Sequence, residues 1–176
     1  MTSRDYFATD PRTDHERMLA GDPYLGGDPE SSRLAYRGFC LADEYYRRCV
    51  SAGFDAARPI LTKLLGGLGE RSTIIPPVHV DHGEHLFIGS RTFVNDNLTA
   101  LDIARITVGN DCQAGPNVRL LTPAHPLEVQ PRRDKLESAE PITLGDNSVV
   151  DAGGPACHAH GDQRFLTIRD TVLNDS

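Results

Sequence analysis

The sequence predicts a mainly β protein: a parallel β-helix with a small α-helical N-terminal cap before it and an irregular C-terminal tail after it. Two observations support this fold class. From Ile75 to about Pro155 an aliphatic residue returns at every sixth position, whereas residues 13–68 show helical periodicity. We therefore expect a cap over residues 1–70, a β-helix over 71–155 and an atypical tail over 156–176.

The cap is expected to contain three helices. Met18 lies in a first charged segment, and residues 31–50 mix apolar residues with Arg, Asp and Glu. A third helix is predicted over 56–68, where leucines and an isoleucine recur at helical spacing and glycines follow. The sequence therefore predicts a small helical cap before the β region.

The β-helix is predicted from three aliphatic series with a period of six. Each hexapeptide would form one flat side of a coil, and three sides would complete it. The hexapeptides IGSRTF, VGNDCQ and LGDNSV share an aliphatic-Gly start, with Gly or Asn expected at corners. The alternative is an antiparallel sandwich, which predicts strict alternation and hairpin turns, and the sequence shows little of either. The series are Ile88, Val94, Ala100 and Ile106; Val108, Ala114 and Leu120; and Leu144 and Val150.

Residues 121–140 interrupt the period and are rich in Pro, Glu and Arg. We expect this segment to protrude as a loop from one corner of the coil. Loops on a rigid scaffold are common places for catalytic residues.

Composition limits the partners. The 176 residues carry 18 Lys and Arg against 25 Asp and Glu, a formal charge of −7 without a long basic stripe, so nucleic acid is not an expected partner. No apolar run approaches the length of a membrane span and residues 1–10 lack signal-peptide features, so we expect a cytoplasmic protein with no membrane contact. The four cysteines lack CxxC spacing and are expected to be free thiols: Cys40, Cys49, Cys112 and Cys157.

Several segments resemble the maltose and galactoside O-acetyltransferases of the hexapeptide-repeat superfamily. These are ERMLAGDPY, GLGERSTIIPPVHVDHG, TFVNDNLTALDIARITVGND and GPNVRLLTPAHPLEVQPRR, and the likeness extends over residues 14–147. The resemblance implies a left-handed β-helix that uses acetyl-CoA as co-substrate to acetylate a hydroxyl of a sugar or glycoside. It also implies a homotrimer in which each active site is built between two chains.

The resemblance implies that His125, in TPAHPLE, is the general base. A sugar hydroxyl is a poor nucleophile, and an imidazole titrates near neutral pH, so it can accept the proton during attack on the thioester. Glu137, in KLESAEP, matches a family acid that would hold the histidine ring in the right tautomer. The alternative is a surface histidine and a solvated acid.

Three further residues match positions that bind the substrates in the family. Asn95 would face the point of acetyl transfer and contact the acceptor or the thioester of acetyl-CoA, whereas Asp102 and Asp81 would bind sugar hydroxyls. The alternatives are structural: a corner asparagine with left-handed backbone, and aspartates that cap turns.

His79, His82 and His85 raise the question of a metal site, because imidazoles at short spacing can bind zinc. Steps of three residues do not repeat on one face of a strand, whose period is two. We therefore expect no metal.

The resemblance stops after Asn147. The family continues with a Val-Trp-Ile-Gly-Gly segment, another coil and an Asn-Pro-Ala-Arg end, whereas this chain reads SVVDAGGPACHAHGDQRFLTIRDTVLNDS and contains no tryptophan. We expect that residues 148–176 arose from a shifted reading frame or a premature end, which the nucleotide sequence in the other frames would test. Two other functions therefore stay open: a catalytically impaired relic of the family, and acetylation of a non-sugar acceptor.

Overall fold

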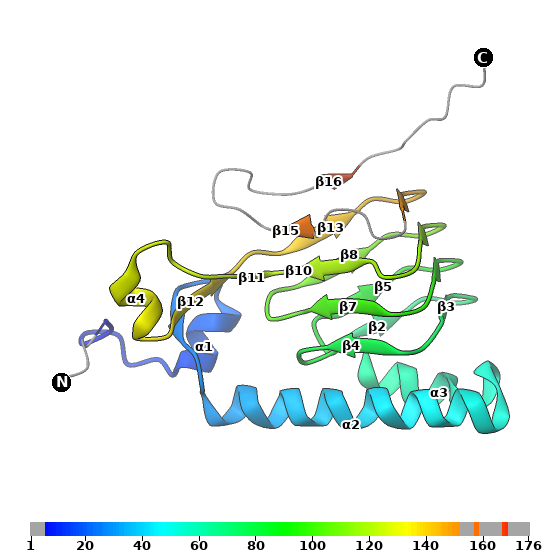
Figure 1. The fold of residues 1–176 in the computed structure, drawn as a ribbon, viewed down its shortest axis with the longest axis horizontal. Coiled ribbons are helices and arrows are strands. Elements are labelled where there is room, and N and C mark those ends of the chain that lie inside the picture. The colour runs from blue at the N-terminus through cyan, green and yellow to red at the C-terminus, as the bar shows by residue number, and fades with distance from the viewer. Residues whose placement is uncertain (1–5, 152–156, 159–166, 169–176) are drawn as a thin grey trace, which may run out of the picture.

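The computed structural model describes residues 6–151 together with two short strands at 157–158 and 167–168. Helices come first in the chain and strands follow, as Figure 1 shows. The long helix α2 runs beneath the coils, and α1 lies beside their turns. The helical elements and the first strand are α1 (Asp14–Leu19), β1 (Tyr24–Leu25), α2 (Pro29–Ala52) and α3 (Phe54–Leu64).

The described strands from β2 onward, except β11 and β12, form a left-handed β-helix whose three sides are parallel sheets, which confirms the predicted fold class. The β4 sheet contains β4 (Val78–Val80), β7 (Leu98–Leu101), β10 (Arg119–Leu121) and β15 (Cys157–His158). The β5 sheet contains β2 (Gly67–Leu68), β5 (Leu86–Ile88), β8 (Ile106–Val108), β13 (Ile142–Leu144) and β16 (Thr167–Ile168). The β3 sheet contains β3 (Thr73–Ile74), β6 (Phe93–Val94), β9 (Gln113–Ala114) and β14 (Val149–Val150).

The residues that stack on one another are 20 positions apart. Leu86 pairs with Ile106, and Ile106 pairs with Ile142 across the inserted segment 121–140. The hexapeptide period alone predicts a repeat of about 18, and the turns at 81–85 and 102–105 supply the extra residues. The aliphatic residues of the predicted series nonetheless face inward and form one core: Ile88, Val94, Ala100, Ile106, Val108, Leu120 and Leu144 are buried, and Ala114 and Val150 are partly buried.

The glycines of the hexapeptides are required for a reason other than the one expected. A Cβ on Gly89 would lie 2.5 Å from the carbonyl carbon of Gly109 in the next coil. The corner residues with left-handed backbone include Arg71, Arg91 and Asp111, at φ of 55–58°, and also asparagines, as expected: Asn97, Asn117 and Asn147, at φ of 59–61°. These glycines therefore permit close stacking of successive coils rather than a special backbone angle.

Two helices close the base of the coil. The hydroxyl of Tyr45, which is buried, donates to the carbonyl of Ile74 at 2.6 Å. The guanidinium of Arg58 donates to the carbonyls of Ser72 and Gly69 at 2.8 and 2.7 Å. Helix α3 ends at Leu64, earlier than predicted, because the first coil already begins at β2.

Segment 121–140, which was expected to be a protruding loop, contains regular secondary structure. It forms β11 (Pro123–Ala124), α4 (Val129–Arg133) and β12 (Leu136–Ala139). β12 pairs antiparallel with β11 on one side and with β1 of the cap on the other. The cap and the protruding segment therefore share one three-stranded sheet, β1-β12-β11, which the sequence did not indicate.

In the predicted tail, β15 pairs with β10 and β16 pairs with β13, both parallel. β15 adds one strand to the β4 sheet, and β16 adds one strand to the β5 sheet. The other residues of 156–176, and the predicted free thiol of Cys157, lie outside the described residues.

Two expectations from composition can be compared with the structure. Cys40, Cys49 and Cys112 are free thiols, as predicted. None of the helices in the described part of the chain combines the length and the apolar character that crossing a membrane requires.

Candidate active site

His125 lies at the outer end of β11, where its side chain is exposed. In the β11–β12 pair, Ala124 is opposite Ser138 and Pro123 is opposite Ala139. One further step of this antiparallel register sets His125 opposite Glu137. Residues directly opposite in such a pair have Cβ atoms about 4.5–5.5 Å apart and share one face. The register therefore predicts that the two residues expected to be catalytic lie near each other, but no hydrogen bond or ion pair joins them within residues 6–151.

Glu137 is held from its other side by the cap. Tyr24 is opposite Glu137 in the β1–β12 pair, and its hydroxyl donates to Oε2 of Glu137 at 3.1 Å. Tyr24 is only 5% exposed, and this burial raises its pKa; the negative charge of Glu137 adds to the shift. Sequence reasoning missed this residue, and its place at the end of the ERMLAGDPY motif was the only available signal.

Asp81 directly follows β4 and lies near the carboxylates of Asp102 and Glu137. Burial, together with the negative charges of Asp102 and Glu137, raises the pKa of its carboxyl to about 6. Within residues 6–151 no hydrogen bond engages the Asp81 carboxyl. Asp81 is thus a partly buried acid close to Glu137, and its predicted contact with a sugar hydroxyl stays a prediction.

Asp102 has no exposed surface, and its carboxylate caps a turn. Oδ1 accepts the backbone N–H groups of Asp81 at 3.1 Å and His82 at 2.9 Å, and Oδ2 accepts that of His85 at 3.1 Å. This is the structural alternative named for an aspartate beside a turn. Direct contact of Asp102 with an acceptor stays a prediction, and it would require the 81–85 turn to open.

Asn95 follows β6, and its Oδ1 accepts the backbone N–H of Asp96 at 2.8 Å. It lines a surface cavity of about 190 Å³ with Phe93, Gln113 and Val149. The corner asparagine with left-handed backbone is Asn97, at φ 61°, and not Asn95.

Asn95 and His125 do not meet within one chain. Asn95 precedes the start of β7 in the β4 sheet, whereas His125 follows β11, beyond the carboxyl end of β10 in the same sheet. Figure 1 shows β3 of the Asn95 side at the right and β11 and β12 at the left. The structure therefore brings His125, Glu137 and Asp81 to one end of the protomer and leaves Asn95 at the other.

Of the three histidines considered for a metal site, two are close together: the rings of His82 and His85 contact edge to face, with their centroids 5.2 Å apart. Nε2 of His79 lies 3.1 Å from Oδ1 of Asn97 on an exposed corner, whereas His82 is buried and burial lowers its pKa. Nδ1 of His85 lies 2.9 Å from the carbonyl oxygen of Asp102. Over the described ranges, no three His, Cys, Asp or Glu side chains gather closely enough to hold a metal ion.

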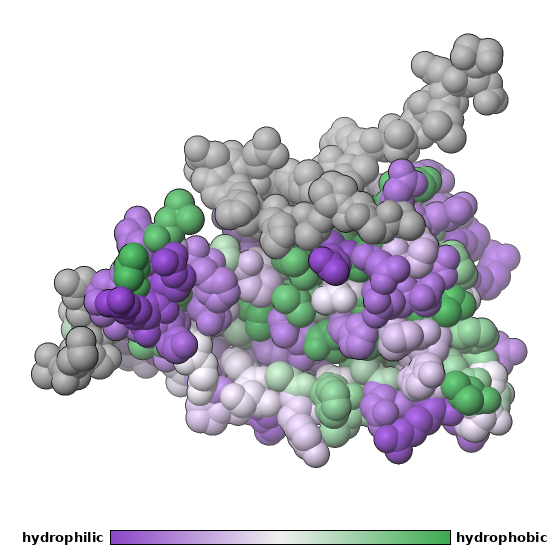
Figure 2. All heavy atoms as spheres, viewed as in Figure 1, coloured by the Kyte–Doolittle hydropathy of each residue, from purple (hydrophilic) through white to green (hydrophobic). Residues whose placement is uncertain are grey.

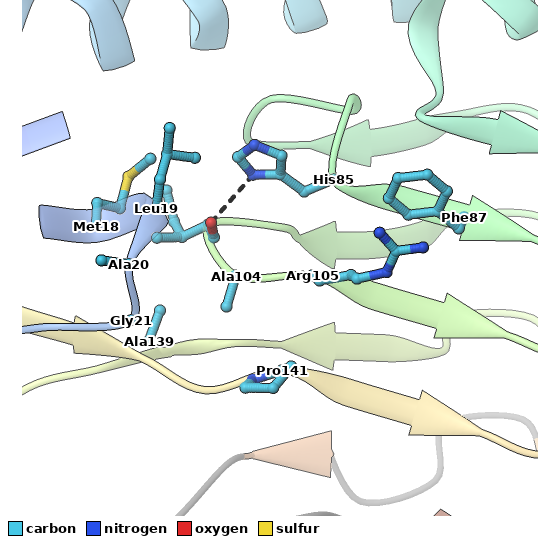
Figure 3. Close-up of a pocket in the computed structure, with 11 residues that line it drawn as sticks. Met18, Leu19, Ala20, Gly21, His85, Phe87, Ala104, Arg105, Ala139 and Pro141 are labelled. Atoms are coloured by element: carbon cyan, nitrogen blue, oxygen red, sulfur yellow. Dashed lines mark hydrogen bonds between the residues drawn. The ribbon is translucent and has the colours of Figure 1, made fainter. Parts of the chain in front are cut away.

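A cavity of about 390 Å³ lies between α1 and the turns of the coil, as Figure 3 shows. Its wall includes Met18, His85 and Arg105, whose guanidinium lies 3.7 Å from the centre of the Phe87 ring. None of the residues predicted to be catalytic lines this cavity. His125 thus lies outside this cavity, and its side chain is exposed.

No family model matches the chain. Nodulation protein L of Rhizobium leguminosarum bv. viciae is 31% identical over 143 residues, which cover 81% of this chain and 74% of the relative. Galactoside O-acetyltransferase of Escherichia coli K12 is 31% identical over 135 residues, 75% of this chain and 64% of that protein. A hexapeptide-repeat-containing acetyltransferase of Vibrio cholerae O1 biovar eltor, solved in complex with acetyl coenzyme A, matches with a TM-score of 0.66 and 29% identity over 81% of this chain and 79% of that one. The coiled fold and these relatives together show that the chain belongs to the hexapeptide-repeat acetyltransferase family.

Proposed function

We propose that this chain transfers the acetyl group of acetyl-CoA to a hydroxyl of a sugar or glycoside, with His125 as general base. The observation that supports the proposal is the β11–β12 register, which, extended by one step, sets the exposed His125 opposite Glu137. The family relationship supports the donor, because a solved relative is complexed with acetyl coenzyme A. The relative named galactoside O-acetyltransferase supports a sugar acceptor.

In the proposed reaction, the acceptor hydroxyl attacks the carbonyl carbon of the thioester while the imidazole of His125 accepts its proton. A C–O bond forms, the C–S bond breaks, and the imidazolium returns the proton to the departing CoA thiolate. Glu137 would orient the imidazole and stabilise its charged form. The mechanism requires no metal, and we place the reaction in the cytoplasm.

Two features of the protomer support a site completed by a second chain. Asn95, proposed to contact the acceptor or acetyl-CoA, lies near the amino end of the strands of the β4 sheet, whereas His125 lies beyond their carboxyl end. Beside His125, Leu127 is 86% exposed and Val129 is 53% exposed, and Figure 2 shows hydrophobic atoms among hydrophilic ones over this protruding segment. We propose a homotrimer in which this segment packs on a neighbour, so that His125 of one chain faces Asn95 of another.

The proposal can be tested by following thiol release from acetyl-CoA with a panel of glucosides, galactosides and maltose. His125→Ala should reduce kcat by about 100-fold or more, because a general base contributes at least that much. His15→Gln serves as the matched control, since His15 is held by Ser31 in the cap and should leave turnover unchanged. Full activity in His125→Ala would contradict the assigned base.

The alternatives give different outcomes. A chain that is assembled by light scattering but binds no CoA by calorimetry would be the catalytically impaired relic. Thiol release with other hydroxyl compounds, and none with the sugars, would indicate a non-sugar acceptor. A monomer that turns over at full rate would contradict the shared site.

A further inference from the structure

We infer that Tyr24, in the N-terminal cap, is a positioning residue that acts on the base His125 through the carboxylate of Glu137. This inference rests on the proposed roles of His125 and Glu137. It assigns the cap a part in the reaction in addition to its structural one.

The strand register places Tyr24 opposite Glu137. Extending the β11–β12 register one step beyond the Ala124–Ser138 pair sets His125 opposite Glu137, so we infer that the three residues form one row across the three-stranded sheet. β12 is the central strand, so Glu137 has Tyr24 on one side and His125 on the other. A change at Tyr24 can therefore reach His125 through one intervening side chain.

Contacts from the N-terminal cap hold the Glu137 carboxylate in position. The Tyr24 hydroxyl donates to Oε2 at 3.1 Å, and within residues 6–151 no other hydrogen bond engages this carboxylate. Oε1 lies 2.8 Å from the point where a Cβ would stand on Gly26, so the absence of a side chain at Gly26 leaves the space that the carboxylate occupies. Both contacts come from a segment that lies more than a hundred residues before Glu137 in the chain.

The electrostatic surroundings explain why such a tether is needed. The charge of Glu137 raises the pKa of Asp81, which means that the two acids lie close enough to repel each other when ionised. Without the Tyr24 hydroxyl, the carboxylate would gain by rotating toward solvent and away from Asp81. It would then no longer hold the imidazole in the orientation that accepts the acceptor proton.

A double-mutant cycle on kcat tests this inference. Tyr24→Phe keeps the buried ring and removes only the hydroxyl, and we expect it to lower kcat about tenfold while KM for acetyl-CoA stays unchanged, since small displacements of a catalytic group have such effects. In a Glu137→Gln background the same substitution should change kcat less than about twofold, because the group it acts through has been altered. Gly26→Ala, which displaces the same carboxylate sterically, should also lower kcat.

Tyr46→Phe is the matched control: its ring is 46% exposed on α2, and loss of its hydroxyl should leave kcat unchanged in both backgrounds. Unfolding midpoints of all variants identify any general loss of structure. Equal effects of Tyr24→Phe in the two backgrounds, or no effect in either, would overturn the inference while leaving His125 in place. No turnover by the unmodified chain with the sugar panel, or full activity in His125→Ala, would instead contradict the proposed function on which the inference rests.

Discussion

Asp81→Asn should stabilise the protein at pH 8 and leave its stability nearly unchanged at pH 4. Asp81 is partly buried near two other carboxylates, which raises its pKa from 3.8 to about 6. The folded state therefore holds this proton more tightly than the unfolded state does. The resulting contribution to stability is fully present below pH 3.8 and is lost as the pH rises through about 6.

The rise in the pKa of Asp81 from 3.8 to about 6 corresponds to about 3 kcal/mol. Solvent screening of the partly exposed side chain reduces this to about 1–2 kcal/mol. Asparagine is neutral at every pH and similar in shape, and no hydrogen bond to the Asp81 carboxyl is lost within residues 6–151. At pH 8 the substitution should thus raise the free energy of unfolding by about 1–2 kcal/mol.

The measurement is denaturant unfolding followed by circular dichroism at pH 4 and pH 8, at constant ionic strength. Asp55→Asn provides the control, because Asp55 is exposed in the first turn of α3 and its loss should cost no more than about 0.5 kcal/mol at pH 8. The same change in stability at both pH values, or a loss of stability at pH 8, would refute the assignment of Asp81 as a destabilising buried charge.

Two further substitutions test how the coil is built. Asp102→Ala should lower the free energy of unfolding by about 3 kcal/mol or more, because it leaves three backbone N–H groups of the 81–85 turn without an acceptor, and a variant as stable as the parent in urea would contradict this role. Gly89→Ala should cost about 3 kcal/mol in the same assay, since its Cβ would meet the backbone of Gly109 in the next coil; an unchanged unfolding midpoint would show that the coils can separate there.

The coil and its core follow from local pattern, and the sequence predicted them. An aliphatic residue at every sixth position can be buried only if each hexapeptide forms one side of a coil, so Ile88, Val94 and Ala100 face the same interior. Helical periodicity likewise located α2 within two residues at each end, because burial of one helix face depends on spacing along the chain. The stacking repeat of 20 was not predicted, because the extra turn residues add no aliphatic signal.

The residues of the candidate site came from the family resemblance, which pointed to His125 as base, Glu137 as its acid and Asp102 as an acceptor contact. Their arrangement was not predicted, and the structure places the Asp102 carboxylate inside a turn. The sequence does not distinguish an aspartate whose carboxylate binds backbone N–H groups from one whose carboxylate binds a ligand. Only packing decides which groups surround it and whether solvent reaches it.

The sequence by itself determined that this chain winds into stacked coils and carries an imidazole on a protruding segment, because both properties depend on residues close together in the chain. Only the tertiary structure decided that β1 of the cap joins β12, which brings the Tyr24 hydroxyl to Glu137 across 113 positions. The tertiary structure alone also decided that Asn95 and His125 lie towards opposite ends of the strands of the β4 sheet. The physical reason is that strand pairing between distant segments is set by the competition of whole surfaces for burial and backbone hydrogen bonds, which no local pattern records.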